Sequence, residues 1–225
     1  MRLPPRPAYA FPMTTPLLFA TSNPHKIREV RAILAPLGFD VAGLNDLPDP
    51  ADLPTEPVED GDTFQANARI KALHYAQATR RLCLADDSGL EVDALGGRPG
   101  VLSARYAGTG NTRAEQTDAN NARLLAELED VPDDRRAARF LCAMCLADPD
   151  GTILAETRGT LEGVIARRPR GTSGFGYDPL VYLPDMDRTV AELTPTEKNA
   201  RSHRGEAARR MAAIIESRSL AGRHR

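Results

Sequence analysis

A run of apolar and small residues that leads into two adjacent carboxylates constrains this chain more than any other feature. Residues Leu82 to Ala85 are typical of a buried strand, and Asp86-Asp87-Ser88-Gly89 follows directly. We expect the strand to end there, because glycine allows the backbone to turn sharply. Adjacent carboxylates repel unless a cation lies beside them, and Mg²⁺ is the usual occupant of an all-oxygen site. The motif predicts a magnesium site at a sheet's rim, with an acidic turn as the alternative.

Composition indicates the class of protein and its surroundings. With 225 residues the chain suits one large α/β domain, and its net charge of -2 gives no reason to expect nucleic acid or a membrane as partner. No apolar run approaches the ~20 residues of a membrane span. Three cysteines exclude a fully paired disulfide framework, and Cys142 and Cys145 lie in an apolar, strand-like run. We therefore expect buried, reduced cysteines and a cytoplasmic location.

The chain divides into three parts. Residues 1–16 are rich in proline and lack a continuous apolar segment, so we expect a disordered N-terminal extension rather than a secretory signal. Residues 17–217 are expected to form a single domain, and residues 218–225 a polar tail. Within the domain, apolar spacing and turn residues predict strands and helices in mixed order. The expected strands are 17–21, 39–42, 82–85, 137–147, 152–160 and 180–183, and the expected helices are 22–37, 63–79, 112–128 and one closing helix from Thr194.

Lysine is rare in this chain, and its positions are informative. Of 29 basic residues only three are lysines, namely Lys26, Lys71 and Lys198. A chain that uses arginine almost everywhere keeps lysine where a compact ammonium is wanted, or by chance. All three lie in segments that other observations mark as functional, whereas chance would scatter them.

Two segments are candidates for binding phosphate and metal. Thr21-Ser22-Asn23-Pro24-His25-Lys26 joins a strand to a helix, where free amides and the helix dipole favour anions, although a simple helix cap is the commoner explanation. The acidic segment before the second helix includes Glu59 and Asp62. Such residues usually complement the helix dipole, but one carboxylate from here could complete a metal shell begun at Asp86 and Asp87.

Two later segments are candidates for binding a base. Phe175 lies between Gly174 and Gly176, which would let its ring stack on a base, but a ring that plugs the core is equally compatible. Lys198 lies in the first turn of a capped helix, so we expect an anion to compensate it. His203 beside Arg204 supplies donors for a base edge or a phosphate, and a packed core histidine is the alternative.

Taken together, these motifs closely resemble the noncanonical purine nucleoside triphosphate pyrophosphatases, also called inosine/xanthosine triphosphatases. The resemblance spans about residues 17–215 in the right order. The matching segments are Thr21-Ser-Asn-x-x-Lys26, Ala85-Asp-Asp-Ser-Gly-Leu90, Ala94-Leu-Gly-Gly-x-Pro-Gly100, Ser103-Ala-Arg-Tyr106, Gly174-Phe-Gly-Tyr-Asp-Pro179, Ala191-Glu-Leu-Thr194, Glu197-Lys198 and Ser202-His-Arg-Gly205.

The resemblance implies a long mixed α/β sheet with flanking helices, two lobes around a central cleft, and a homodimer. It implies Mg²⁺-dependent hydrolysis of ITP, dITP or XTP to the monophosphate and pyrophosphate. Asp87 would accept a proton and bind the metal with Glu59. The residues implied to bind substrate are Thr21, Ser22, Asn23, Lys26, Ser88, Phe175, Gly176, Tyr177, Asp178, Lys198, His203 and Arg204.

Two departures and two rival functions stay open at this stage. Many members carry two adjacent glutamates where this chain has Val58-Glu59, and many carry glutamate where it has Ala66. The first difference reduces a paired carboxylate, the expected source of the second metal ligand, to Glu59. The rivals are a pyrophosphatase for pyrimidine or modified nucleotides and a nucleotide- or RNA-binding module without turnover. A binding module would be expected to show a basic stripe with interleaved aromatic residues, yet aromatics are only 5% of this chain.

Overall fold

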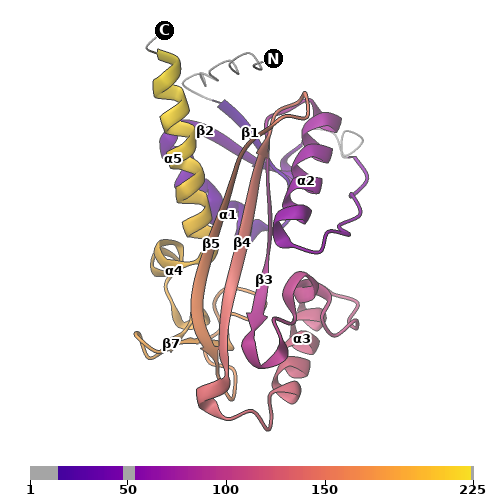
Figure 1. The fold of residues 1–225 in the computed structure, drawn as a ribbon, viewed down its shortest axis with the longest axis vertical. Helices are drawn as coiled ribbons and strands as arrows, with labels where there is room; N and C mark the ends of the chain where they lie inside the picture. Colours follow the sequence, from indigo (N-terminus) through magenta and orange to yellow (C-terminus); the bar gives the residue numbers. More distant parts are fainter. Residues whose placement is uncertain (1–14, 48–53, 224–225) are drawn as a thin grey trace, which may run out of the picture.

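The computed structural model describes residues 15–47 and 54–223, and the expected N-terminal extension lies almost wholly outside them. Figure 1 shows three long strands, β3, β4 and β5, running through the molecule with helices along both sides. The helices and strands are β1 (Thr15–Phe19), α1 (Pro24–Leu34), β2 (Phe39–Gly43), α2 (Phe64–Thr79), β3 (Cys83–Val92), α3 (Arg113–Glu127), β4 (Ala137–Ala147), β5 (Ile153–Ile165), β6 (Val181–Leu183), β7 (Arg188–Thr189), α4 (Pro195–Arg201) and α5 (His203–Arg223).

The described strands form one seven-stranded mixed sheet in the order β2-β1-β3-β4-β5-β6-β7. Strand β1 is parallel to β2 and β3, and the pairs from β3 to β7 are antiparallel. The α/β class and the long mixed sheet are therefore confirmed. The arrangement as two lobes around a cleft stays a prediction.

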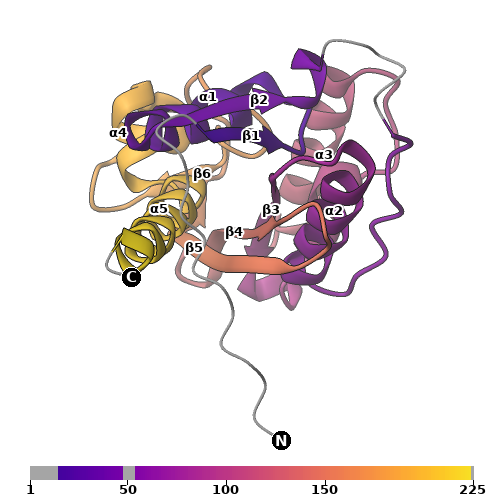
Figure 2. The same cartoon turned by 90° about the horizontal axis from the view of Figure 1, so that it is seen from above.

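Alternation along β1 shows how the sheet is covered on both faces. Leu17 and Phe19 pack into a core with α1 and α5, whereas Leu18 and Ala20 pack into a second core with α2. Successive side chains of a strand point to opposite faces, so a strand with helices on both sides is apolar throughout. Figure 2 shows α5 and α2 on opposite sides of β4 and β5.

The prediction that the third strand ends at the carboxylates is wrong. Strand β3 continues through Asp86 and Asp87 to Val92, paired with β4 along its whole length. Gly89 makes no turn. A Cβ there would lie 2.3 Å from Ser103 Oγ and 2.8 Å from the Gly100 carbonyl oxygen, so only glycine lets the following loop pack against the strand. The motif glycine serves close packing rather than chain reversal.

The apolar spacing predicts one continuous closing helix, but the structure has two, α4 and α5. Helix α4 begins at its capping box on Thr194, as expected, but ends before Ser202, whose ψ of 152° is extended. The Ser202 hydroxyl then accepts a hydrogen bond from Gly205 N at 3.0 Å and caps α5. A Cβ on Gly205 would lie 2.1 Å from the Asn199 carbonyl oxygen, so the two helices meet closely. The break places His203 and Arg204 in the first turn of a new helix.

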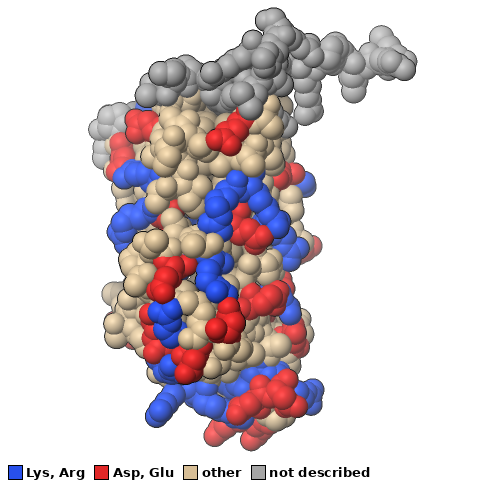
Figure 3. Space-filling model, turned by 90° about the vertical axis from the view of Figure 1, so that its left-hand side faces the viewer, with Lys and Arg blue, Asp and Glu red and all other residues tan. Residues whose placement is uncertain are grey.

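The cysteines, the helices and the surface charge can be compared with what the composition predicts. All three cysteines are free and buried, as expected. Among the described residues no helix combines the length and apolar character that a membrane crossing requires. Figure 3 shows basic and acidic side chains interspersed over the face that carries α4 and α5, with no continuous basic stripe on that face.

Candidate active site

A pocket forms where β3 extends beyond the end of β1. Strand β1 pairs with β3 only as far as Phe19 and Leu84, and Ala20 N donates to the Leu84 carbonyl oxygen at 2.8 Å. Beyond that point no described strand pairs with this edge of β3 until the following loop meets it near Gly89, so side chains from both of its faces can reach the same space. A pocket of about 550 Å³ occupies this position. It reconciles the alternation of Asp86 and Asp87 along the strand with a site that both of them line.

The structure brings all of the predicted site residues to this one pocket. They come from the turn after β1, the first turn of α1, the segment before α2, strand β3, the loop before β6, and helices α4 and α5. The predicted residues that line the pocket are Thr21, Ser22, Asn23, Lys26, Glu59, Asp87, Ser88, Phe175, Gly176, Tyr177, Asp178, Lys198, His203 and Arg204.

The turn after β1 is held by its own side chains. Asn23 is the N-cap of α1 and its Oδ1 accepts a hydrogen bond from His25 N at 2.9 Å, while Asn23 N donates to Thr21 Oγ1 at 3.2 Å. The helix-cap interpretation of Asn23 is therefore confirmed. Capping and ligand binding are compatible here. Pro24 has no N–H and those of Asn23 and His25 are engaged by the cap, which leaves the Lys26 N–H of the first turn for a ligand.

On one face of β3, Asp86 is buried between two cations. Lys26 Nζ lies 3.0 Å from its Oδ1, and Arg204 Nε lies 3.1 Å from its Oδ2. The same guanidinium donates to Ser88 Oγ at 2.7 Å and contacts Glu29 at 2.8 Å. Burial by itself would raise the pKa of Asp86, but the two cations outweigh it and hold the pKa well below its usual range. Asp86 is consequently ionised and orients Lys26 and Arg204 toward the pocket.

On the other face, Asp87 is half-buried and weakly compensated. It accepts a hydrogen bond from Asn67 Nδ2 at 3.1 Å, and its Oδ1 lies 3.6 Å from Lys71 Nζ. Lys71 is closer to Glu59, at 2.8 Å. Burial raises the pKa of Asp87 despite these partners, whereas the neighbouring carboxylates raise the pKa of Lys71 against the effect of its burial. A half-buried carboxylate with a raised pKa is suited to accept a proton.

The loop before β6 places an aromatic ring beside a buried ion pair. Lys198 Nζ lies 2.6 Å from Asp178 and 3.3 Å from Glu29, which are the anions expected to compensate it. Asp178 also accepts a hydrogen bond from Phe175 N at 2.8 Å and so fixes the loop. The Phe175 ring lies 4.8 Å from Lys198 Nζ and 5.5 Å from the His25 ring. The ring borders the pocket rather than filling the hydrophobic core.

His203 combines features of both alternatives considered for it. Its ring is buried and stacks on Phe140 with centroids 4.9 Å apart, as a core histidine would. Yet it lines the pocket, and its Nδ1 has no hydrogen-bond partner among the described residues. Burial and the nearby Arg204 and Lys198 cations lower its pKa well below the usual value, so the imidazole is neutral. An unpaired buried nitrogen at the wall of a pocket is available to a ligand.

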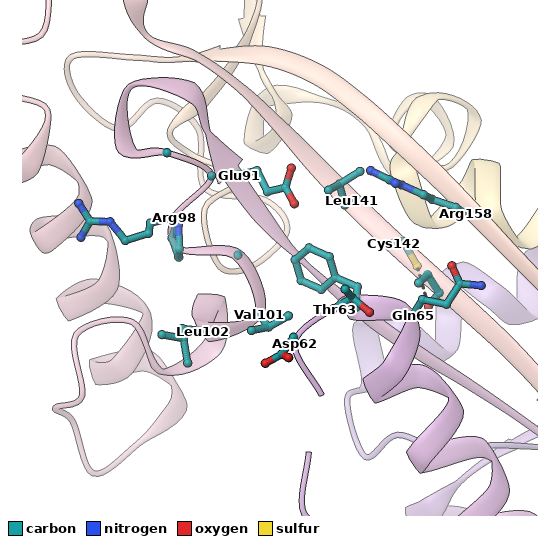
Figure 4. A pocket seen from close by; sticks show the side chains of 16 residues that line it. Asp62, Thr63, Gln65, Glu91, Arg98, Val101, Leu102, Leu141, Cys142 and Arg158 are labelled. Atoms are coloured by element: carbon teal, nitrogen blue, oxygen red, sulfur yellow. Dashed lines mark hydrogen bonds between the residues drawn. The ribbon is translucent and has the colours of Figure 1, made fainter. Parts of the chain in front are cut away.

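A second cavity, of about 520 Å³, lies on the far side of the loop after β3. Figure 4 shows side chains of opposite charge around it, with Glu91 and Arg158 on strands and Arg98 on the loop. It gathers none of the predicted site residues. We assign the chemistry to the first pocket, because only that pocket combines carboxylates and cations with an uncovered strand edge.

The sequence did not identify three residues that contact the charged side chains of the site. Lys71 was noticed as a rare lysine but was given no partner, although it joins Glu59 to Asp87. Asn67 and Glu29 look like ordinary helix residues in the sequence. The contact of Asn67 with Asp87 and that of Glu29 with Lys198 arise only from tertiary packing. No local signal in the sequence could therefore have identified these two residues.

The chain is similar to known proteins over nearly its whole length. The sequence model of the Ham1 family matches residues 17–214. A dITP/XTP pyrophosphatase from Exiguobacterium sibiricum is 48% identical over 199 residues, covering 88% of this chain and 96% of that protein, and one from Bacillus subtilis is 44% identical. A solved HAM1 protein structure from Coxiella burnetii gives a TM-score of 0.78 at 39% identity, covering 91% of this chain and 100% of that one. A dITP/XTP pyrophosphatase structure from Mycobacterium abscessus gives 0.68 at 44%, covering 89% and 98%.

Proposed function

This chain belongs to the Ham1 family, and on that premise we propose that it hydrolyses noncanonical purine nucleoside triphosphates, namely ITP, dITP and XTP. The products would be the nucleoside monophosphate and pyrophosphate, and the effect would be to clear these nucleotides from the pool. One observation carries the proposal. A half-buried carboxylate with a raised pKa, Asp87, lies in the same pocket as four cations held by carboxylates.

Asp87 is the proposed catalytic residue. Hydrolysis at the α-phosphorus needs a water that loses a proton as it attacks, and Asp87 Oδ1 or Oδ2 can accept that proton. Asn67 holds one carboxylate oxygen at 3.1 Å and leaves the other toward Lys71. The hydrogen bond from the Asn67 amide fixes the orientation of the Asp87 carboxylate, so the carboxylate is protonated at a defined position.

The donor set fits magnesium. Glu59 and Asp87 both approach the Lys71 ammonium, at 2.8 and 3.6 Å, so two carboxylates already converge on one positive charge. No group of three or more potential metal-binding side chains occurs in residues 15–47 and 54–217. Mg²⁺ commonly binds through one or two carboxylates with water and substrate phosphate oxygens, which matches this pair. When bound, Mg²⁺ would neutralise charge on the phosphates.

The two ends of the nucleotide would meet different walls. Thr21, Ser22 and Asn23 lie at the N-terminus of α1, where backbone donors and the Lys26 ammonium suit phosphate oxygens. Phe175 would stack on the purine, and the free nitrogen of His203 would bond to a base edge.

The remaining proposed contacts complete the nucleotide site and its setting. The residues concerned are Ser88, Gly176, Tyr177, Asp178, Lys198 and Arg204, all in the pocket lining.

We further propose a cytoplasmic homodimer without a nucleic-acid or membrane partner. The proposed organisation is a domain at 17–217 between an N-terminal extension and a polar tail. Helix α5 continues to Arg223, beyond the proposed start of the tail.

A product assay over a nucleotide panel tests the function. Purified protein with MgCl₂ is incubated with ITP, dITP, XTP, ATP, GTP, TTP and UTP, and pyrophosphate is measured separately from orthophosphate. We expect pyrophosphate from the first three and little from the others. Preferential cleavage of TTP or UTP would favour the pyrimidine rival. Nucleotide binding without pyrophosphate release from any purine triphosphate would favour the binding module.

A further inference from the structure

Four cations of the pocket are already paired with carboxylates of the protein; Lys198 and Arg204 are buried, and Lys26 and Lys71 are partly buried. Each ion pair is short, so these cations add little uncompensated charge for an incoming polyanion. The pairs are Lys26–Asp86 at 3.0 Å, Lys71–Glu59 at 2.8 Å, Lys198–Asp178 at 2.6 Å and Arg204–Glu29 at 2.8 Å. A nucleoside triphosphate carries a charge of about -4, so the pocket needs further positive charge to bind it.

Two arginines of the same pocket are in a different state. Arg105 and Arg113 line the pocket, and both are exposed. In the described parts, residues 15–47 and 54–217, neither guanidinium makes a recorded hydrogen bond or ion pair, in contrast to the paired cations. These two guanidinium groups are therefore the ones in the pocket lining with their donors and charge free for a ligand.

The wall that carries the two arginines is internally fixed. Ser103, two residues before Arg105, accepts a hydrogen bond from Leu90 N of β3 at 2.9 Å. Asn120 of α3 donates to the Ser103 and Ala104 carbonyl oxygens at 3.2 and 3.1 Å. The loop, the helix and the catalytic strand thus form one unit. Because the backbone is held, only the two arginine side chains have to become ordered when a ligand binds.

Arg113 is in addition placed against the helix dipole. It is the first residue of α3, directly after the N-cap Thr112. A cation at the positive end of a helix is unfavourable. Glu115 in the same turn bonds to the backbone amides of Asn111 and Thr112 and, within the described part of the chain, makes no ion pair with Arg113, so an anionic ligand would still offset the charge of the guanidinium. The planar guanidinium donates two parallel hydrogen bonds to phosphate, which an ammonium cannot do.

We propose that Arg105 and Arg113 form a phosphate-binding pair that holds the terminal phosphates of the substrate, which leave as pyrophosphate. The assignment rests on the proposed function for the identity of the ligand. The paired cations would then fix the geometry around the reacting phosphorus, and the unpaired arginines would supply the charge that retains the polyanion.

Isothermal titration calorimetry with two probes tests the pair. Inorganic pyrophosphate reports on the terminal phosphates, and IMP reports on the rest of the nucleotide, both in MgCl₂ buffer. The variants are R105A, R113A, the double variant and R113K. The control is R168A, which removes an exposed arginine outside the pocket lining.

We expect each single alanine variant to weaken pyrophosphate binding about tenfold and the double variant about 100-fold, as the loss of charge-assisted hydrogen bonds predicts. R113K should lie between wild type and R113A, because it keeps the charge but loses the fork. IMP affinity and R168A should remain within about twofold of wild type. The weakening should diminish at higher salt, because the arginines are exposed.

Several results would overturn the assignment. They are unchanged pyrophosphate affinity in the double variant, an equal loss of IMP affinity, or no pyrophosphate binding by the wild type. A failure of the proposed function would be seen in a different measurement, the product assay. A wild type that releases no pyrophosphate from any purine triphosphate would refute the activity, while the titrations would still decide whether the arginines bind phosphate.

Discussion

Asp86 and Asp87 are adjacent in the chain and identical in chemistry, yet the structure gives them opposite states. Asp86 is 1% exposed and pairs with Lys26 and Arg204, which lower its pKa. Asp87 accepts hydrogen bonds from Asn67 Nδ2 and from the Ser88 backbone N, its nearest ammonium is more distant, and burial raises its pKa. The cause is the pleat of β3, which turns the two side chains to opposite faces. One carboxylate is a structural anion, and the other is the proposed proton acceptor.

The substitution Asp87→Asn should produce the largest effect on activity. Removing a general base lowers turnover by about 10²–10⁴-fold, and the isosteric amide keeps the fold. Stability should stay equal or rise, because a poorly compensated charge has been removed. Steady-state pyrophosphate release together with urea unfolding measures both quantities. Near-normal turnover would remove Asp87 from its proposed role.

The matching substitution Asp86→Asn should act mainly on stability. It removes the counter-charge of the partly buried Lys26 and leaves the buried Arg204 with Glu29 alone, and breaking a buried ion pair costs about 3–5 kcal/mol. Urea unfolding measures the loss. If Asp86→Asn proved as stable as Asp87→Asn, the contrast between the two faces of β3 would be incorrect.

Acid should separate the two carboxylates in the same experiment. Since the folded pKa of Asp86 is lowered, its contribution to stability is present above the ordinary aspartate pKa of about 3.9 and is lost as pH falls below it. The folded pKa of Asp87 is raised, so its protonated form is favoured by folding and stability is lost as pH rises through that pKa.

Unfolding free energies measured against pH for the wild type and both asparagine variants check these signs. The advantage of the wild type over Asp86→Asn should shrink in acid. Relative to Asp87→Asn, the wild type should become less stable as pH rises. The same sign for both variants would contradict the two assignments.

An exposed ion pair provides the smallest expected effect and a control. Arg69 Nη2 lies 2.7 Å from Glu156 Oε2, as close as the buried pairs, but the arginine is exposed. Glu156→Gln should cost only about 0.2–1 kcal/mol and leave turnover unchanged, because solvent screens such pairs. A loss as large as that of Asp86→Asn would show that proximity rather than burial decides the contribution of a pair.

The order of elements could be read from the sequence, since caps and apolar periods are local. Pro24 and Gly38 marked the limits of the segment that begins with α1, and Thr194 marked the start of α4. The two errors have one cause. Gly89 was interpreted through backbone freedom, and the closing helix through its apolar period, whereas Gly89 and Gly205 are each required by the close approach of atoms from another segment.

The sequence by itself determined the α/β class and a set of site residues that do share one pocket, because the motif residue types and their order are properties of the chain. Only the tertiary structure decided which carboxylate is compensated, that Lys71 joins Glu59 to Asp87, and that Arg105 and Arg113 remain unpaired. Charge compensation depends on distances between segments far apart in the chain, and on burial, which no local pattern contains.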